Sequence, residues 1–277
     1  MRSRVTDAFA WQGRVGDVWA EEWRRTDRSF AGLSQHLDAA IAEDAPRTGR
    51  ALDIGCGAGG TSLALAAARP SLAIHGVDLS AGLVVVATRR AAAANLSNAR
   101  FEVGDAATPP GVPYDLAFSR HGVMFFTDPV TAFATIRTAM ARGAPLVFSC
   151  FRTAAENGWA VALAEALGQP VSAASTAPGP FAFADREHVA RILAAAGWHH
   201  AAPRAVDFTY VAGAGEAPVE DALAFFRRIG PAARALADTT EAERPRLLDR
   251  LAAMLDARVR DGTIAFPAAA WIWTARA

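Results

Sequence analysis

The sequence contains no lysine, so every basic side chain other than histidine is an arginine. This absence excludes a P-loop lysine, a Schiff-base lysine and any other lysine-dependent catalyst. The 28 basic residues are balanced by 28 acidic ones, and the sequence pI is near 7.0. The chain therefore lacks the overall positive charge that binds a phosphate backbone, and nucleic acid is not an expected partner.

Cysteine is also scarce, since the 277 residues include only Cys56 and Cys150. Two cysteines are too few for a disulfide framework and fit a reducing compartment. Charged residues and tryptophans interrupt the N-terminal stretch where a secretory segment would need a continuous apolar run, and no stretch approaches the length of a membrane span. We expect a cytoplasmic protein without a membrane span; a homodimer stays open.

What the sequence does have is a regular alternation of short apolar strands and helices from residue 50 onward. The pattern predicts strands at 50–54, 72–77, 101–105, 114–119 and 144–150. Helices are predicted between them at 60–69, 81–94 and 129–141. Such alternation is typical of a parallel sheet covered on both faces, so we predict an α/β fold with a doubly wound, Rossmann-like sheet.

The rhythm changes after residue 151. Helices are predicted at 155–168, 185–197, 218–229 and 240–260, and strands at 203–211 and 263–274. We expect one domain over residues 50–277, with insertions at about 152–184 and 213–262 that form a cap over one edge of the sheet.

Residues 1–49 form a predicted helical cap segment. Trp11, Val15, Trp19 and Trp23 recur every four residues, which places them on one helical face, with a break near Gly13 and Gly16. A second helix is predicted from Leu33 to Ala42. The tryptophans either dock this segment on the sheet or roof a ligand pocket, and both interpretations stay open.

The first predicted strand ends in a glycine turn, Asp53-Ile-Gly-Cys-Gly-Ala-Gly59. Its G-x-G-x-G spacing differs from the G-x-G-x-x-G pattern of dinucleotide sites, and a carboxylate at Asp53 would be unhelpful beside a pyrophosphate. Asp78 ends the next strand, roughly twenty residues on, where related folds bind ribose hydroxyls. The pattern favours a cofactor with a nucleoside and a cationic amino-acid end over NAD.

These motifs resemble those of class I S-adenosylmethionine-dependent methyltransferases, in particular the ubiquinone/menaquinone-methylase-like group. The motifs that carry the resemblance are Leu52–Gly60, Gly76–Ser80, Gly104–Ala106 and Tyr114–Phe126, in order along the chain. Bacterial proteins of uncharacterised substrate also share Met124–Phe133, Ala155–Trp159 and Ala177–Asp185. The resemblance implies a seven-stranded sheet whose last strand is antiparallel.

The resemblance also implies the binding roles of individual residues. Gly55, Gly57 and Gly59 would let the backbone approach the methionine part of S-adenosylmethionine, with Asp53 near its ammonium group. Asp78 would bind the ribose and Leu79 would pack on the adenine. The remaining implied cofactor residues are Asp105 and Ala106 at the adenine amine and Ser119 and Arg120 beside the sulfonium.

The predicted function is methyl transfer from S-adenosylmethionine, with S-adenosylhomocysteine as product, to a small, partly apolar acceptor at O, N or C. Proximity and desolvation would supply most of the acceleration. His121 is the candidate base and Arg120 a second catalytic candidate, although pocket lining or a structural hydrogen bond also explains His121.

The expected acceptor pocket includes Trp11, Trp19, Trp23 and Met124. No metal constellation is present in the sequence. The Asn/Asp-Pro-Pro-Tyr/Phe motif of amide and adenine N-methylases is missing after the fourth strand, which argues against those acceptors. Two alternatives stay open, an NAD-linked oxidoreductase on a similar fold and a non-catalytic S-adenosylmethionine-binding protein.

Overall fold

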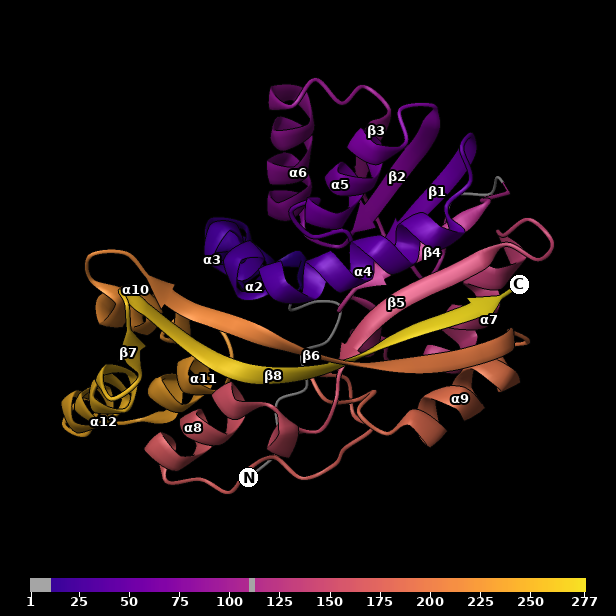
Figure 1. Ribbon diagram of the computed structural model, residues 1–277. Coiled ribbons are helices and arrows are strands. Elements are labelled where there is room, and N and C mark those ends of the chain that lie inside the picture. Colours follow the sequence, from indigo (N-terminus) through magenta and orange to yellow (C-terminus); the bar gives the residue numbers. More distant parts are fainter. Residues whose placement is uncertain (1–10, 110–112) are drawn as a thin grey trace.

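The computed structural model describes residues 11–109 and 113–277, whose strands form one mixed sheet of eight (Figure 1). The spatial order is β3-β2-β1-β4-β5-β8-β6, and the short β7 pairs with β8. The strands are β1 (Gly49–Ile54), β2 (Leu72–Asp78), β3 (Ala99–Val103), β4 (Leu116–Arg120), β5 (Pro145–Phe151), β6 (His199–Ala214), β7 (Val259–Arg260) and β8 (Thr263–Arg276).

The first five strands are parallel, and β8 runs antiparallel to both β5 and β6. The strand order reverses beside β1, so the cleft outside the carboxyl ends of β1 and β4 is the expected ligand position in such a sheet. The predicted doubly wound sheet with an antiparallel last strand is confirmed, with the two-residue β7 as an addition.

The helices fall into three groups: an N-terminal set, those that connect the parallel strands, and those inserted before the last strand. They are α2 (Arg14–Glu21), α3 (Trp23–Ser29), α4 (Ala31–Asp44), α5 (Gly60–Ala68), α6 (Ala81–Ala93), α7 (Pro129–Thr138), α8 (Gly158–Leu167), α9 (Arg186–Ala195), α10 (Pro218–Phe226), α11 (Pro231–Asp238) and α12 (Arg244–Asp256), with 3₁₀ turns η1 (Val123–Phe125) and η2 (Ala154–Glu156).

Several of these helices begin where a short polar side chain can accept a hydrogen bond from a backbone amide of the first turn. Ser80 accepts from the amide of Leu83 at the start of α6, and Asp128 accepts from the amide of Thr131 at the start of α7. Asp185 does the same for the amide of Glu187 in α9. These caps satisfy N–H groups that have no partner inside the helix, so the sequence itself sets where each helix begins.

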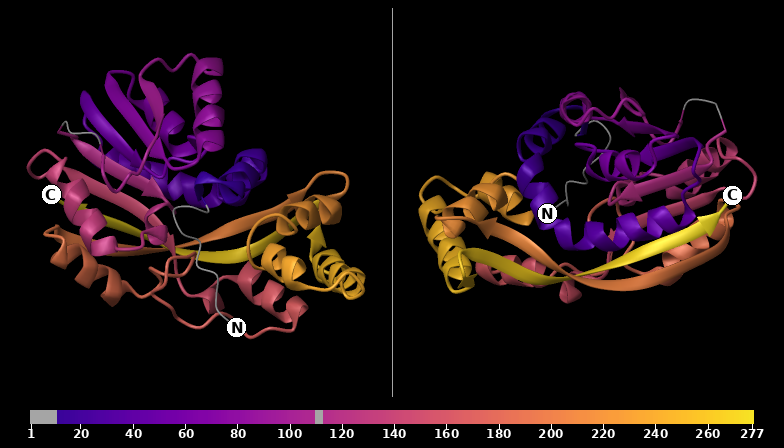
Figure 2. Two further views of the ribbon diagram at one scale, coloured as in Figure 1. Left: turned by 180° about the vertical axis from the view of Figure 1, so that it is seen from behind. Right: turned by 45° about the horizontal axis from the view of Figure 1, so that its top comes forward.

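Both faces of the sheet are covered. The helices α4, α5 and α6 form one layer, in which α4 crosses β4, β5, β8 and β6 (Figure 1). The helices α7 and α9 contact each other over the opposite face (Figure 2). The central strand β5 is consequently buried along its whole length, as expected for a strand enclosed between two helical layers.

The strands β6 and β8 continue well beyond their neighbours as a long two-stranded ribbon (Figures 1 and 2). The helices α8, α10 and α12, together with α11, cluster around the extended part of this ribbon. The inserted segments at about 152–184 and 213–262 thus supply α8 and α10–α12, with β7, while the N-terminal helix α3 packs against β6 from the other side.

Three local predictions were wrong. The N-terminal segment does not carry Trp11 to Trp23 on one helix, because the chain bends at Glu22 between α2 and α3. The carboxylate of Glu22 is 3% exposed and pairs with Arg25 and Arg228, which holds the bend. The helix α11 was not predicted as a separate element, and β6 begins at residue 199 and ends at 214, beyond the predicted 203–211.

Candidate functional site

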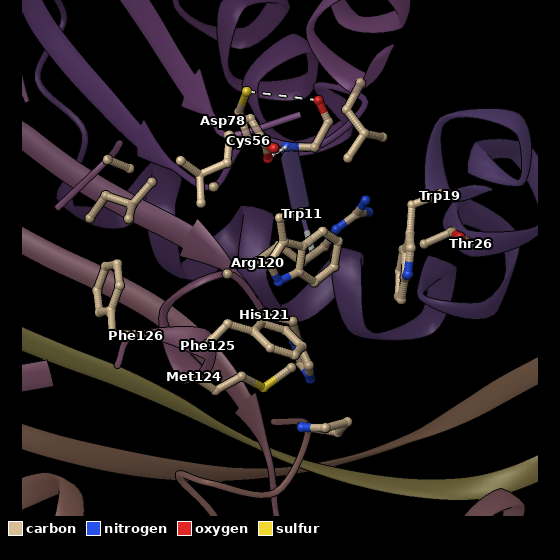
Figure 3. A pocket seen from close by; sticks show the side chains of 18 of the residues that line it. Trp11, Trp19, Thr26, Cys56, Asp78, Arg120, His121, Met124, Phe125 and Phe126 are labelled. Atoms are coloured by element: carbon tan, nitrogen blue, oxygen red, sulfur yellow. Dashed lines mark hydrogen bonds between the residues drawn. The ribbon is translucent and has the colours of Figure 1, made fainter. Parts of the chain in front are cut away.

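A cavity of about 500 Å³ lies at the carboxyl ends of β1, β2 and β4 (Figure 3). This volume is typical of small-molecule sites. Cys56 and Asp78 lie on one side of it, and His121, Met124 and Phe125 lie on the other, with Trp11 between them. The cavity therefore joins the glycine turn to the N-terminal helices and to the inserted segments.

The glycine turn forms the first wall. Gly55, Gly57 and Gly59 have φ angles of +65°, +54° and +79°, which side chains other than glycine rarely adopt. A Cβ atom at Gly57 would meet no atom within 4 Å, so the backbone there is open to a ligand. A Cβ atom at Gly59 would lie 3.0 Å from Ala87 and Phe101, so this glycine instead allows close packing behind the wall.

Asp78 supplies the main carboxylate of this wall. Its Oδ2 accepts from the amide of Gly57 at 2.8 Å, and its Oδ1 accepts from the amide of Ser80 at 2.9 Å. Burial raises the pKa of Asp78, and the two backbone donors oppose that rise. Each oxygen keeps a lone pair for a further donor, as two ribose hydroxyls would require.

Leu79, Asp105 and Ala106 also line the cavity, next to Asp78. The carboxylate of Asp105 accepts from the amide of Ala107 at 2.9 Å, which closes a turn after β3. The ends of β1 and β2 and the turn after β3 thereby bring together residues that the sequence separates by as much as 50 positions.

Three other predicted cofactor residues do not line the cavity: Asp53, Gly59 and Ser119. Asp53 is 2% exposed and accepts from Ser62 Oγ at 2.7 Å, while burial raises its pKa to about 7. The Ser119 hydroxyl donates to the carbonyl of Ile54 at 2.6 Å. These groups tie β1 to α5 and β4 behind the wall, and their direct contact with a donor molecule stays a prediction.

Arg120 lies at the end of β4 and does line the cavity. Its guanidinium pairs with Asp27 at 2.6 Å and donates to Ser34 Oγ at 3.1 Å. Asp27 also pairs with Arg90 at 2.8 Å. Arg120 thus connects the strand end to the N-terminal helices, with its charge compensated by a carboxylate of α3.

His121 follows directly, at the point where the chain leaves β4. Its φ of +60° is a left-handed conformation that non-glycine residues seldom adopt. Its Nδ1 lies 2.8 Å from Ser149 Oγ, and its Nε2 is buried without a hydrogen-bonding partner among residues 11–109 and 113–277. Burial, reinforced by the nearby charge of Arg120, lowers the pKa of His121 to about 3, so the imidazole is neutral at ordinary pH.

The N-terminal tryptophans all line the cavity, as the pocket interpretation of the sequence expected. The Trp11 ring lies 5.7 Å from that of Trp19 and 5.1 Å from that of Phe125. Trp23 lies between two guanidinium groups, with Arg90 at 4.1 Å and Arg24 at 4.5 Å from its ring centre. Met124, which is 3% exposed, completes the predicted pocket residues.

The structure adds an aromatic wall that the sequence did not reveal. Its members come from the junction of α3 and α4, from η1 and the residue after it, and from β5, α8, β6 and α10, and all of them line the cavity. They are Phe30, Phe125, Phe126, Phe151, Trp159, Tyr210, Phe225 and Phe226. The only sequence signal was the aromatic content of these segments, because no spacing rule links residues that the tertiary fold brings together.

Neither a metal-binding cluster nor a membrane-spanning helix is found in the described part of the chain. Residues 11–109 and 113–277 contain no group of three or more histidine, cysteine or acidic residues that could hold a metal ion. Within the same residues, no helix has both the length and the apolar character of a membrane span.

Comparison with known proteins agrees with this fold and site. Residues 51–143 match a family described as a methyltransferase domain. An aklanonic acid methyltransferase of Streptomyces sp. (strain C5) is 34% identical over 152 residues, which cover 53% of this chain and 65% of that protein. A release factor glutamine methyltransferase of Rhodospirillum rubrum is 46% identical over 72 residues, or 26% of this chain and 22% of that one. The chain thus spans less than two thirds of the curated relatives that it matches.

Solved structures share the fold at low sequence identity. The phosphoethanolamine N-methyltransferase 2 of Haemonchus contortus, in complex with phosphomonomethylethanolamine and S-adenosylhomocysteine, has a TM-score of 0.57 at 20% identity, covering 100% of this chain and 61% of that one. These solved structures thus share the fold of this chain. By sequence, residues 51–143 resemble a methyltransferase domain.

The residues present fit S-adenosylmethionine. The open backbone at Gly57 leaves room for a ligand, and Asp78 keeps lone pairs for two hydroxyl groups. The apolar Leu79 adjoins this carboxylate, as a flat base would need. Residues at this end of the cavity would therefore hold the nucleoside, and the cavity continues beyond them toward His121.

Proposed function

We propose that this protein transfers a methyl group from S-adenosylmethionine to a small organic acceptor that carries a planar, apolar ring system and at least one oxygen. The observation that carries this proposal is the continuity of the cavity from the glycine turn and Asp78 to the aromatic wall. A site that only bound the donor would not need a second, aromatic half of this kind.

The aromatic wall supports an acceptor with flat apolar surface. The Phe151 ring lies 5.4 Å from that of Trp159, which in turn stacks on Tyr210 at 5.5 Å. Such aromatic surfaces favour a planar partner through offset stacking and edge contacts. The Streptomyces relative is an aklanonic acid methyltransferase, and an organic acid as its substrate agrees with an oxygen-bearing small molecule here.

The bound donor would supply an already activated methyl group, so this chain's residues have to bind, align and desolvate. Asp78 and Asp105 would hold the nucleoside, and the aromatic wall would exclude water from the reacting end. The N-terminal helices, through Trp11 and Trp19, would cover the cavity from above. This division accounts for catalysis without a metal ion or a covalent intermediate.

The role of His121 as a base stays a prediction. A group whose conjugate acid has a pKa of about 3 takes up protons poorly near neutral pH. It nevertheless lines the cavity next to the end of β4, on the side away from Asp78. We therefore assign His121 to the acceptor site without requiring it to accept a proton.

Calorimetry with S-adenosylhomocysteine and with NAD tests the cofactor part of the proposal. We expect S-adenosylhomocysteine to bind in a 1:1 ratio and NAD to give no heat. Tight NAD binding without S-adenosylhomocysteine binding would support the oxidoreductase alternative and end the proposal.

Turnover is tested by following S-adenosylhomocysteine release with panels of hydroxylated naphthoquinones, aromatic carboxylic acids, phenols and amines. Release with an oxygen-bearing ring compound is expected. If the protein binds the donor but every oxygen-bearing ring compound fails, this acceptor class is wrong. The Asp78→Asn variant, which should bind the donor weakly, is the matched background for each assay.

A further inference from the structure

The hydroxyl of Ser149, on β5, has a single hydrogen-bonding partner within residues 11–109 and 113–277. This partner is His121 Nδ1, at 2.8 Å. Ser149 itself is fully buried, with a relative exposure of 0%. Because this hydroxyl is not accessible to solvent, it cannot donate its hydrogen bond to bulk water.

Only two hydrogen-bonding arrangements fit this pair. In the first, Ser149 Oγ donates to Nδ1 and the ring proton is on Nε2. In the second, Nδ1–H donates to Ser149 Oγ and the hydroxyl proton has no acceptor. Nε2 has no partner among the described residues in either arrangement, so the two differ in the hydroxyl proton, which lacks an acceptor in the second. A buried donor without a partner costs about 1–3 kcal/mol, so this difference favours the first arrangement by at least about fivefold.

The rest of the environment keeps the ring in place. The backbone amide of His121 donates to the carbonyl of Ser149 at 3.2 Å, so both main chain and side chain join these two residues. The rings of Phe151 and Phe30 lie 4.3 Å and 4.9 Å from the imidazole. The lowered pKa keeps the ring neutral, so the distinction between its two tautomers persists at ordinary pH.

The unpartnered Nε2 then needs an explanation. Buried polar atoms in native proteins nearly always have a partner, and His121 Nε2 has none among the described residues. His121 lines the cavity beside Met124 and Phe125, on the side away from Asp78 (Figure 3). A proton on Nε2 would be satisfied by a hydrogen-bond acceptor, and a ligand in the aromatic half would supply one.

We propose that Ser149 is a positioning residue that holds His121 with its proton on Nε2, so that His121 donates a hydrogen bond to an oxygen atom of the acceptor. The second half of this proposal rests on the proposed function, whereas the tautomer does not. It names the acceptor's chemistry more closely: a carbonyl, carboxylate or phenolate oxygen would satisfy Nε2–H, and an ammonium group would not. An Nε2 that already carries its proton also cannot serve as the base.

The tautomer can be observed directly by ¹⁵N NMR of the whole protein labelled at histidine, without any acceptor. The sequence has six histidines, and the spectrum of a His121→Gln variant assigns the His121 signals. We expect wild-type protein with S-adenosylhomocysteine to show a protonated Nε2 and an unprotonated Nδ1. A protonated Nδ1 in the wild type would overturn the proposal.

Variants at Ser149 separate positioning from mere packing. Ser149→Ala should lower the ratio of Nε2–H to Nδ1–H by at least about fivefold, because the donor to Nδ1 is gone. Ser149→Thr, which keeps the hydroxyl, should retain the wild-type ratio. Ser29→Ala removes another fully buried hydroxyl, which bonds to the carbonyls of Arg25 and Val211 and to the Tyr210 side chain, and should leave His121 unchanged. An unchanged ratio in Ser149→Ala would overturn the positioning role.

The donor role is tested in protein labelled with ¹⁵N at both histidine and tryptophan, by adding 2-hydroxy-1,4-naphthoquinone, with 2-methylnaphthalene as the matched hydrocarbon without oxygen. We expect the quinone to shift both the indole signals and the His121 Nε2 signal, and the hydrocarbon to shift the indole signals alone. A quinone that shifts the indoles but not Nε2 overturns the donor role. If neither compound shifts any signal, the proposed acceptor class fails and the donor role fails with it, while the tautomer result is unaffected.

Discussion

The two halves of the cavity are built in different ways. The nucleoside half consists of short turns at the ends of neighbouring strands, and its ligand-facing groups are backbone amides, Asp78 and Asp105. The aromatic half consists of side chains from the N-terminal helices, β5, β6 and the inserted helices. The first half depends on local backbone geometry, whereas the second depends on long-range packing.

This difference has a physical consequence for stability. A backbone turn such as Gly55–Gly59 is held by hydrogen bonds from the amides of Gly55 and Cys56 to the Val77 carbonyl of the adjacent strand β2, and by its glycine conformations. The aromatic wall is itself part of the hydrophobic core, since Phe151 and Trp159 are 4% and 6% exposed. We therefore expect substitutions in the nucleoside half to change ligand binding first, and substitutions in the aromatic wall to change folding first.

The largest effect is expected for Phe151→Ala. The Phe151 ring contacts Phe30, Trp159, Phe181 and His121 with centroid distances between 4.3 and 5.8 Å. Replacing a buried aromatic side chain by alanine should lower the free energy of unfolding by about 3–5 kcal/mol, through lost burial and a residual cavity. Urea denaturation followed by tryptophan fluorescence measures this change.

Val103→Ala is the control for Phe151→Ala, because Val103 is 51% exposed on the edge strand β3. It should change the free energy of unfolding by less than about 0.5 kcal/mol. If Phe151→Ala also lowered the free energy of unfolding by less than about 1 kcal/mol, the aromatic wall would contribute little to the stability of the core. The contrast between the two halves would then disappear.

The second prediction concerns His121, which lies next to the end of β4 and packs against Phe30 and Phe151 of the aromatic wall. Its pKa is about 3 in the folded protein and near 6.5 in the unfolded chain. Below pH 6.5 the imidazole of His121 is protonated in the unfolded chain but stays neutral in the native protein. The free energy of unfolding therefore decreases with falling pH, by up to about 1.4 kcal/mol per pH unit. Wild-type protein should lose about 2 kcal/mol more than His121→Gln between pH 6.5 and 4.5.

Urea denaturation at several pH values measures the difference between the two proteins, in which the contributions of the other titrating groups cancel. The exposed His36 provides the control, since His36→Gln should keep the wild-type pH profile. Parallel profiles for wild type and His121→Gln would mean that the imidazole is accessible to protons, and hence that it is less enclosed by the aromatic wall than the structure indicates.

The same contrast explains how much could be predicted from the sequence. Asp78, Leu79 and Asp105 line the cavity, and the sequence pointed to them because each lies at or just after the end of a strand, in a motif whose spacing reflects local backbone geometry. Their contact with a donor molecule stays a prediction. Phe151 and Tyr210 were missed because they lie 59 positions apart and meet through the tertiary fold alone. The bend at Glu22 was missed for a similar reason, because its partner Arg228 belongs to an inserted segment.

Among the predicted site residues, Asp53 and Ser119 show what a sequence motif does not predict, namely which of its side chains line the cavity. Both belong to the motifs, yet both side chains bond to neighbouring elements behind the wall. Their residue types are explained by the need to satisfy buried polar groups at strand ends. A motif therefore identifies the residues that build a site without telling which of them face the ligand.

Asp78→Asn is the third prediction and tests the nucleoside half. The amide lacks the charge that strengthens the bonds from Gly57 and Ser80, and it offers one oxygen in place of two. The affinity for S-adenosylhomocysteine should fall by about 2 kcal/mol, or roughly 30-fold, in calorimetry. Asp44→Asn, which removes the partner of Arg276 far from the cavity, should bind as wild type does.

The free energy of unfolding of Asp78→Asn should change much less than its affinity, in contrast to Phe151→Ala. A loss of stability equal to or larger than the loss of affinity would show that the nucleoside half is also held by the global fold. The proposed distinction between local backbone geometry and long-range packing would then be wrong for this half.

The smallest effect is expected for Arg90→Gln, which tests how the two halves are joined. The Arg90 guanidinium donates to the carbonyl of Ala58 at 2.6 Å, pairs with Asp27 at 2.8 Å and lies over the ring of Trp23. It therefore links the glycine turn to α3, which carries part of the cover. The ion pair is about one-fifth exposed, so its loss with that of the cation–π contact should weaken S-adenosylhomocysteine binding by only about 1 kcal/mol, or fivefold.

The neighbouring Arg89 is exposed on the same helix, and Arg89→Gln should leave the affinity unchanged. Equal affinities for Arg90→Gln and Arg89→Gln would mean that the cover does not depend on this link, so that the halves bind their ligands independently.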